Sequence, residues 1–159
     1  MEDALMAVRK RLGHMERALE EARAAALRGE VPVGAVLVNL DGEIVAQAGN
    51  RTRELSDPSA HAEMLVIREA AARLGSERLV DHDLYVTLEP CAMCATVISY
   101  ARIRGLYYGA ADPKSGGVEH GARVFSHATC HHRPDLYPGL AEDEAKALLQ
   151  EFFAGRRSG

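Results

Sequence analysis

The chain of 159 residues contains only three cysteines, an odd number that does not provide a framework of disulfide bonds. This low count favours a reducing compartment. The sequence also lacks any stretch close to the roughly 20 apolar residues that a membrane-spanning helix needs. Its N-terminal residues mix acidic and basic side chains every few positions, unlike a signal peptide. We therefore expect a cytoplasmic protein without a membrane segment.

An excess of positive charge is lacking as well. The 19 Lys and Arg residues are outnumbered by 23 Asp and Glu residues, which gives a net charge of −4. Because dedicated nucleic-acid-binding domains usually have a basic pI, a pI near 6.0 argues mildly against one. Positive charge outside the acidic segments is instead local, at Arg51, Arg53, Arg102, Arg104, Lys114 and Arg133.

No low-complexity segment, internal repeat or linker rich in Pro, Gly and Ser divides the chain. At 159 residues and 47% hydrophobic, it is long enough for one sizeable core and too short for two ordinary domains. We therefore predict a single domain over residues 14–159, preceded by an N-terminal extension of residues 1–13.

Hydrophobic periodicity and turn residues predict helices alternating with strands. The expected helices cover about residues 14–28, 60–75, 91–101 and 141–157. The expected strands cover about residues 33–39, 43–49, 82–88 and 104–110. Residues 112–139 show no regular pattern and are expected to be irregular. The alternation predicts an α/β fold, in which right-handed crossovers place helices on the faces of a mixed sheet.

Two short motifs, "HAE" and "PCAMC", each fall where a loop enters an expected helix. The thiols of Cys91 and Cys94 and the imidazole of His61 are zinc ligands, and a helix N-terminus together with a metal lowers the pKa of a thiol. Structural zinc sites are closed by four protein ligands, whereas catalytic sites keep the fourth position for water. Three ligands therefore predict one catalytic Zn²⁺ per subunit.

Glu63 lies too far around the helix from His61 to join it easily on one ion, because residues two apart project roughly 200° from each other. The carboxylate is better placed beside the water in the open position. There it can take a proton as general base and deliver it as general acid. The predicted chemistry is hydrolysis with loss of a protonated leaving group. Ring carbons that lose ammonia are natural substrates.

Other interpretations of these motifs exist. A single "HxE" occurs by chance, and a single "CxxC" can be a redox pair or half of a structural zinc site. A non-catalytic, zinc-stabilised interaction module is a further alternative, and it would tolerate replacement of Glu63. The two motifs in this order, each opening a helix, favour the catalytic site. "CHH" at residues 130–132 is expected to be a loop with a free thiol, because adjacent side chains rarely converge on one ion.

"HAE" and "PCAMC" resemble the zinc signature of the cytidine/deoxycytidylate deaminase superfamily. More narrowly, the chain is similar to the bacterial tRNA-specific adenosine deaminases in "GEVPVGAVLV", "GNR", "DPSAHAEM", "DLYVTLEPCAMC", "RIRGLYYGAADPKSG" and "LLQEFFAGRR". The resemblance implies a three-layer α/β/α fold with about five strands in a mixed central sheet. It also implies a homodimer that converts adenosine to inosine at the wobble position of an arginine tRNA, with the anticodon loop as substrate.

The resemblance assigns zinc binding to His61, Cys91 and Cys94 and the proton shuttle to Glu63. It places Asn50 on the flipped base, and Asp112 and Lys114 near the bound anticodon loop. Alone, Asn50 is an ordinary turn residue and the other two lie in a solvated loop.

An enzyme that acts on a base within RNA must hold the neighbouring nucleotides with aromatic and basic groups. Phe153, Arg156 and Arg157 in the last helix could supply stacking and phosphate contacts. Alternatively, the phenylalanines of this helix belong to the core and its arginines to a solvated end. A deaminase of a free nucleobase or nucleoside, such as guanine or cytosine, is the alternative function on the same fold, because zinc chemistry does not depend on substrate size.

Overall fold

The computed structural model describes residues 1–157, with the side chain of Arg157 outside that description. Its centre is a five-stranded sheet in the order β2-β1-β3-β4-β5. β1 runs antiparallel to β2 and β3, whereas β3, β4 and β5 are parallel. The strands are β1 (Gly34–Val38), β2 (Ile44–Gly49), β3 (Asp83–Leu88), β4 (Gly105–Ala110) and β5 (Asp135–Pro138). The predicted mixed sheet is confirmed.

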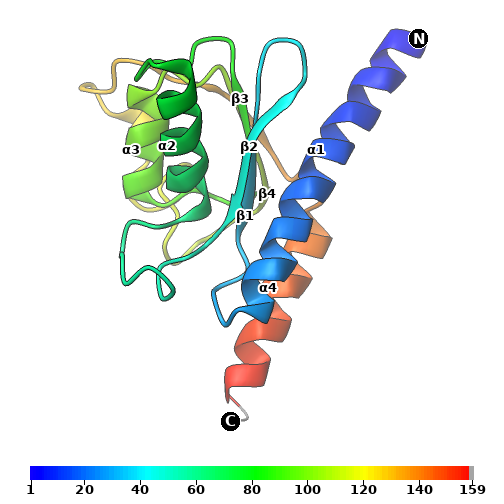
Figure 1. Ribbon diagram of the computed structural model, residues 1–159, viewed down its shortest axis with the longest axis vertical. Helices are drawn as coiled ribbons and strands as arrows, with labels where there is room; N and C mark the ends of the chain where they lie inside the picture. Colours follow the sequence, from blue (N-terminus) through cyan, green and yellow to red (C-terminus); the bar gives the residue numbers. More distant parts are fainter. Residues whose placement is uncertain (158–159) are drawn as a thin grey trace.

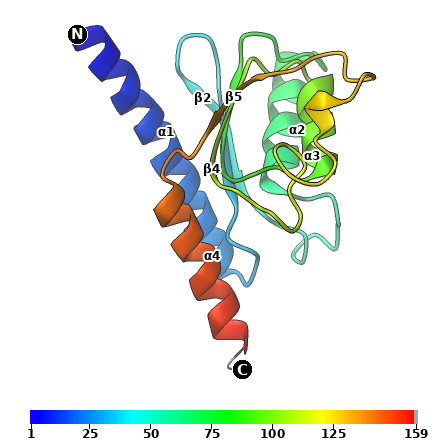
Figure 2. The same ribbon diagram turned by 180° about the vertical axis from the view of Figure 1, so that it is seen from behind.

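Helices cover both faces of this sheet (Figures 1 and 2). Side chains alternate along β1, so that Val36 packs towards one face and Leu37 towards the other, each within a separate hydrophobic cluster. The three predicted layers are therefore confirmed. One face carries α1 (Glu2–Leu27) and α4 (Glu142–Arg157), and the other carries α2 (Ala62–Leu74) and α3 (Ala92–Tyr100).

The first helix is longer than the sequence pattern predicts. A start near residue 14 is wrong, because α1 begins at Glu2 and projects beyond the sheet (Figure 1). Residues 2–12 are mostly strong helix formers, and Gly13, which has open space around it, costs only about 1 kcal/mol within a helix. All of residues 1–13 are exposed. The division between extension and domain at residue 14 stays a prediction, since the helix runs through it unbroken.

The segment 112–139 is not wholly irregular, which corrects the expectation for it. It contains a single 3₁₀ turn at Val124–Ser126 and the edge strand β5. β5 has only four residues, all exposed, and ends at Pro138. Its extended form depends on parallel pairing with β4, a long-range contact that leaves no alternating pattern in the local sequence. Among the helices within residues 1–157, none combines the length and apolar character that crossing a membrane would require.

Candidate functional site

The two predicted motifs meet at the N-termini of α2 and α3. His61 and Cys91 are the N-cap residues of these helices, both with extended backbones, and Cys94 lies in the first turn of α3. The ligand atoms of the three residues all lie within 4.8 Å of one another. The imidazole Nδ1 of His61 is 3.6 Å from Sγ of Cys91 and 3.5 Å from Sγ of Cys94. The predicted convergence of the two helix starts is confirmed.

These distances fit a zinc ion. Tetrahedral coordination with standard Zn–S and Zn–N bonds places a sulfur and a nitrogen ligand about 3.6 Å apart. The chemistry of the thiols also fits a cation. Hydrogen bonding from Cys94, together with His61, lowers the pKa of Cys91 to about 4. The hydrogen bond to Cys91 and burial raise the pKa of Cys94, so a second thiolate here requires a positive charge to neutralise it.

Glu63 lies beside the three ligands and not among them. It is only 3% exposed, in the first turn of α2, and lines the same pocket as His61 and Cys91. Burial raises the pKa of its carboxyl group, which interaction with its own backbone N–H and with His61 partly offsets. A buried carboxyl group with a raised pKa is suited to take up a proton and release it again.

Asn50 connects the pocket to the start of α2. Its Oδ1 accepts a hydrogen bond of 2.8 Å from the backbone N–H of Ala62, the first residue of α2. The N-cap residue His61 makes no capping hydrogen bond with its own side chain, so Asn50 supplies an acceptor at this helix start. Because Oδ1 is occupied in this way, the amide Nδ2 is the donor that Asn50 can offer to a ligand. Asn50 is 8% exposed and lines the pocket with Glu63, so the contact with a base that the resemblance implies stays a prediction.

The pocket at the zinc ligands has a volume of about 230 Å³. A second pocket, of about 410 Å³, adjoins it and shares four lining residues with it: Val31, Leu88, Asp112 and Ser115. Lys114 and Phe153 line the second pocket only. Asp112, Lys114 and Phe153 therefore line the cavity next to the site, and they come from a loop and from the last helix.

Some side chains at the end of α4 are engaged in contacts within the protein. The guanidinium of Arg156 lies 4.4 Å from the ring centroid of Phe152 and donates a hydrogen bond of 2.6 Å to the carbonyl of Gly29. Phe152 is half-buried between the Phe153 ring and the Arg156 guanidinium, whereas Phe153 is 45% exposed. The side chain of Arg157 lies outside the described residues.

Two of the arginines that carry positive charge outside the acidic segments form ion pairs with acidic side chains. Arg51 contacts Glu54 at 2.7 Å. Arg104 binds Asp83 through two hydrogen bonds, of 3.0 and 2.7 Å, at the end of β3 farthest from the zinc ligands. Neither of these two arginines is therefore an unpaired positive charge.

Within residues 1–157, the "CHH" segment takes part in no cluster of three metal-ligating side chains. Cys130 is a free thiol that donates a hydrogen bond of 3.1 Å to the carbonyl of His132 and lies 3.5 Å from the hydroxyl of Ser99. His132 in turn contacts the carbonyl of Ile103. The expectation of a loop with a free thiol is confirmed.

Residues 8–110 match the model of the cytidine and deoxycytidylate deaminase zinc-binding region. The chain belongs to this deaminase family. It is 62% identical to the tRNA-specific adenosine deaminase of Agrobacterium fabrum (strain C58) over 148 residues, which cover 93% of this chain and 97% of that protein. The matched range contains His61, Cys91 and Cys94, the cluster that fits a zinc site.

Two solved deaminases have the same fold. A tRNA A34 deaminase, studied for A-to-I editing at the wobble position, superposes with a TM-score of 0.84 and 64% identity, covering 86% of this chain and 99% of that one. A guanine deaminase from Bacillus subtilis superposes with a TM-score of 0.62 and 30% identity, covering 91% of this chain and 92% of that one. The fold is thus common to deaminases of different substrates.

Sequence reasoning does not single out two buried glutamates of this deaminase, Glu30 and Glu89. The Glu30 carboxylate accepts hydrogen bonds from the backbone N–H groups of Arg53 and Glu54 and from the Thr52 hydroxyl, at 2.9 to 3.3 Å. Glu89 holds a second loop in the same manner, through backbone N–H groups. The sequence signal for both is a glutamate followed within two residues by a proline and flanked by apolar residues, in "GEVP" and "LEPC".

Replacing Asn50 by Ala should lower kcat/KM about 10- to 100-fold, because the variant loses the amide donor that lines the pocket and the hydrogen bond to the start of α2. Asn50→Asp separates the two effects, since it retains the acceptor for Ala62 and loses the amide donor. Steady-state kinetics of both variants test this. Asn39→Ala is the matched control, because Asn39 also accepts backbone N–H bonds but lies in the β1–β2 turn. An unchanged kcat/KM in both Asn50 variants would remove this residue from the binding site.

Proposed function

We propose that this deaminase converts adenosine to inosine at the wobble position of a tRNA, and that an arginine tRNA supplies the anticodon loop. The arrangement of the two adjoining pockets carries the proposal. The inner pocket, about 230 Å³, is smaller than the roughly 300 Å³ at which sites for whole small ligands begin, and it suits a single base. The outer pocket offers Lys114 and Phe153 to the nucleotides that neighbour this base in a polynucleotide.

The reaction adds water to the ring carbon that carries the amino group and releases that group as ammonia. Zinc held by His61, Cys91 and Cys94 would activate the water molecule. Glu63 then accepts a proton from the water and delivers it towards the leaving amino group. Its burial supports this role, because the raised pKa of the carboxyl group lets one side chain act as base and afterwards as acid.

The alternative substrate is a free base. The guanine deaminase of Bacillus subtilis has the same fold, at 30% identity. Two observations favour RNA: the higher identity to the tRNA-specific relative, 62%, and the outer pocket, which a free base would leave empty. The homodimer and the cytoplasmic location stay predictions, as does the choice of arginine tRNA.

Inosine formation by the zinc-loaded protein should occur on an arginine tRNA anticodon stem-loop with adenosine at the wobble position, and not on free adenosine. Ammonia release and nucleoside analysis would be compared for the stem-loop, adenosine, guanine and cytosine. A stem-loop of another tRNA with adenosine at the same position tests the tRNA identity. Turnover of a free base with none of the stem-loop would replace this function by nucleobase deamination.

A further inference from the structure

Glu89 is a buried carboxylate whose bonds all lead to one loop. Its side chain is fully buried at the end of β3. Oε2 accepts hydrogen bonds from the backbone N–H groups of Val118, Glu119 and His120, at 3.1, 3.0 and 3.2 Å. Oε1 accepts one of 3.0 Å from the N–H of Asp112 and lies 2.8 Å from the ring Nδ1 of His120. Both ends of the segment 112–120 are thereby fixed to one side chain.

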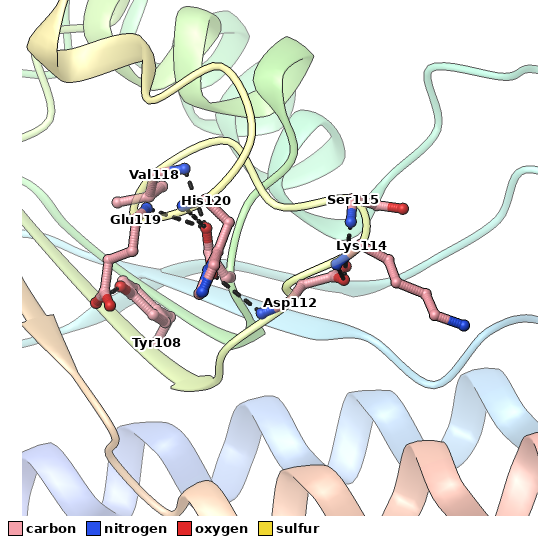
Figure 3. A network of polar contacts seen from close by, with 8 residues as sticks. Tyr108, Asp112, Lys114, Ser115, Val118, Glu119 and His120 are labelled. Carbon is pink, nitrogen blue, oxygen red and sulfur yellow. Dashed lines mark hydrogen bonds and ion pairs between the residues drawn. The ribbon is translucent and has the colours of Figure 1, made fainter.

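Figure 3 shows this arrangement. Val118, Glu119 and His120 lie on one side and Asp112 on the other, and the dashed lines from their nitrogens converge between the two groups. The carboxylate of Glu119 points away, towards the hydroxyl of Tyr108. Glu119 therefore belongs to the network through its backbone alone, while its side chain makes a separate contact.

Close packing holds the same loop against the start of α3. The N–H of Gly117 donates a hydrogen bond of 2.8 Å to the carbonyl of Pro90, directly before the zinc ligand Cys91. A Cβ atom at Gly116 would lie 2.3 Å from Oε2 of Glu89. A side chain at this position therefore cannot enter without displacing the loop or the carboxylate.

The segment that Glu89 holds carries side chains of the pocket walls. Oδ1 of Asp112 accepts hydrogen bonds from the backbone N–H groups of Lys114 and Ser115, at 3.2 and 3.0 Å, which shapes a tight turn (Figure 3). Asp112 and Ser115 line both pockets, and Lys114 lines the outer one. Residues 112–115 thus form a wall of both pockets. The position of this wall relative to the zinc ligands depends on Glu89, which itself lines only the inner pocket.

We propose that Glu89 is a positioning residue for the polynucleotide, which sets the wall formed by residues 112–115 at a fixed place beside the zinc ligands. The inference rests on the proposed function, because it assigns the wall to RNA outside the reacting base. Glu89 acts through the loop and not on the chemical step. Its loss therefore weakens substrate binding and leaves the deamination step intact.

Glu89→Gln should raise KM for the anticodon stem-loop about tenfold, with kcat changed less than about twofold and zinc content unchanged. We call the hydrogen bonds from the backbone of residues 112–120 to the Glu89 carboxylate the tether. In either orientation of the new amide, its NH₂ group faces a backbone N–H donor, so some of these hydrogen bonds are lost. Gly116→Ala disturbs the same contact from the loop. The double variant should show little further increase in KM, because the two changes remove one interaction.

Glu119→Gln is the matched control: it is the same substitution within the same loop, on a side chain that is not part of the tether. Its KM should equal that of the wild type. A fall in kcat at unchanged KM, a loss of zinc, or additive effects of Glu89→Gln and Gly116→Ala would each overturn the positioning role. If the wild-type protein turns over only a free base, the proposed function fails by itself. The same comparison with that base then decides the role of Glu89, since an unchanged KM would eliminate it.

Discussion

Replacing Glu63 by Gln should lower kcat about 10²- to 10⁴-fold while the protein stays folded and fully loaded with zinc. This range is the usual contribution of one general acid–base group. Gln has nearly the same shape and cannot take up the proton of the water. Because Glu63 lies beside the ligand cluster and not within it, zinc binding should not depend on its charge. Single-turnover kinetics and zinc quantification on the same preparation test both statements.

Stability distinguishes this loss from misfolding. Burial raises the pKa of the Glu63 carboxyl group, so at pH above its unfolded value the ionised group destabilises the folded, zinc-free protein. Glu63→Gln removes that cost, and the free energy of unfolding at neutral pH should not fall. Glu69→Gln is the matched control on the same helix, where the side chain is 40% exposed and pairs with Arg73. Retained turnover in Glu63→Gln would eliminate the proton shuttle.

The metal centre can be predicted from the sequence because each of its ligands lies in a short, recognisable local pattern. His61 and the two cysteines each lie within a few residues of a helix start, and helix starts can be recognised from turn residues followed by a periodic pattern. Only the meeting of the two helix starts is a long-range property, and the α/β alternation implies it. The strands β1 to β4 and the helices α2 to α4 are predictable for the same reason.

The tether of Glu89 and the strand β5 could not be predicted in this way. A glutamate has the same local appearance whether it is solvated or fully buried, and its burial here depends on backbone N–H groups 23 to 31 residues away. β5 depends on pairing with β4. Both features are defined by contacts between distant segments, so they require coordinates. The contacts that we propose between this loop and the substrate are correspondingly less predictable than the zinc ligands.

Cys94→Ala should abolish zinc binding and reduce turnover more than about 10³-fold, a loss that combines the missing ligand with the missing metal. Cys94 is fully buried, and no other thiol or imidazole in the described chain lies in its cluster to replace it. Two protein ligands fall short of the three that catalytic zinc sites use. Cys130→Ala is the matched control, because it removes a free thiol outside the cluster and should retain zinc and activity.

The same pair of variants separates catalysis from folding. An ion that binds only the folded state stabilises it by mass action, so a chelator should lower the Tm of the wild type and of Cys130→Ala. The Tm of Cys94→Ala should be the same with and without chelator, because there is no bound zinc to remove. Zinc retained at one ion per chain in Cys94→Ala would contradict the ligand assignment. A Tm of the wild type that is insensitive to complete removal of zinc would instead show that His61 and the two cysteines hold their positions through the packing of α2 and α3 alone.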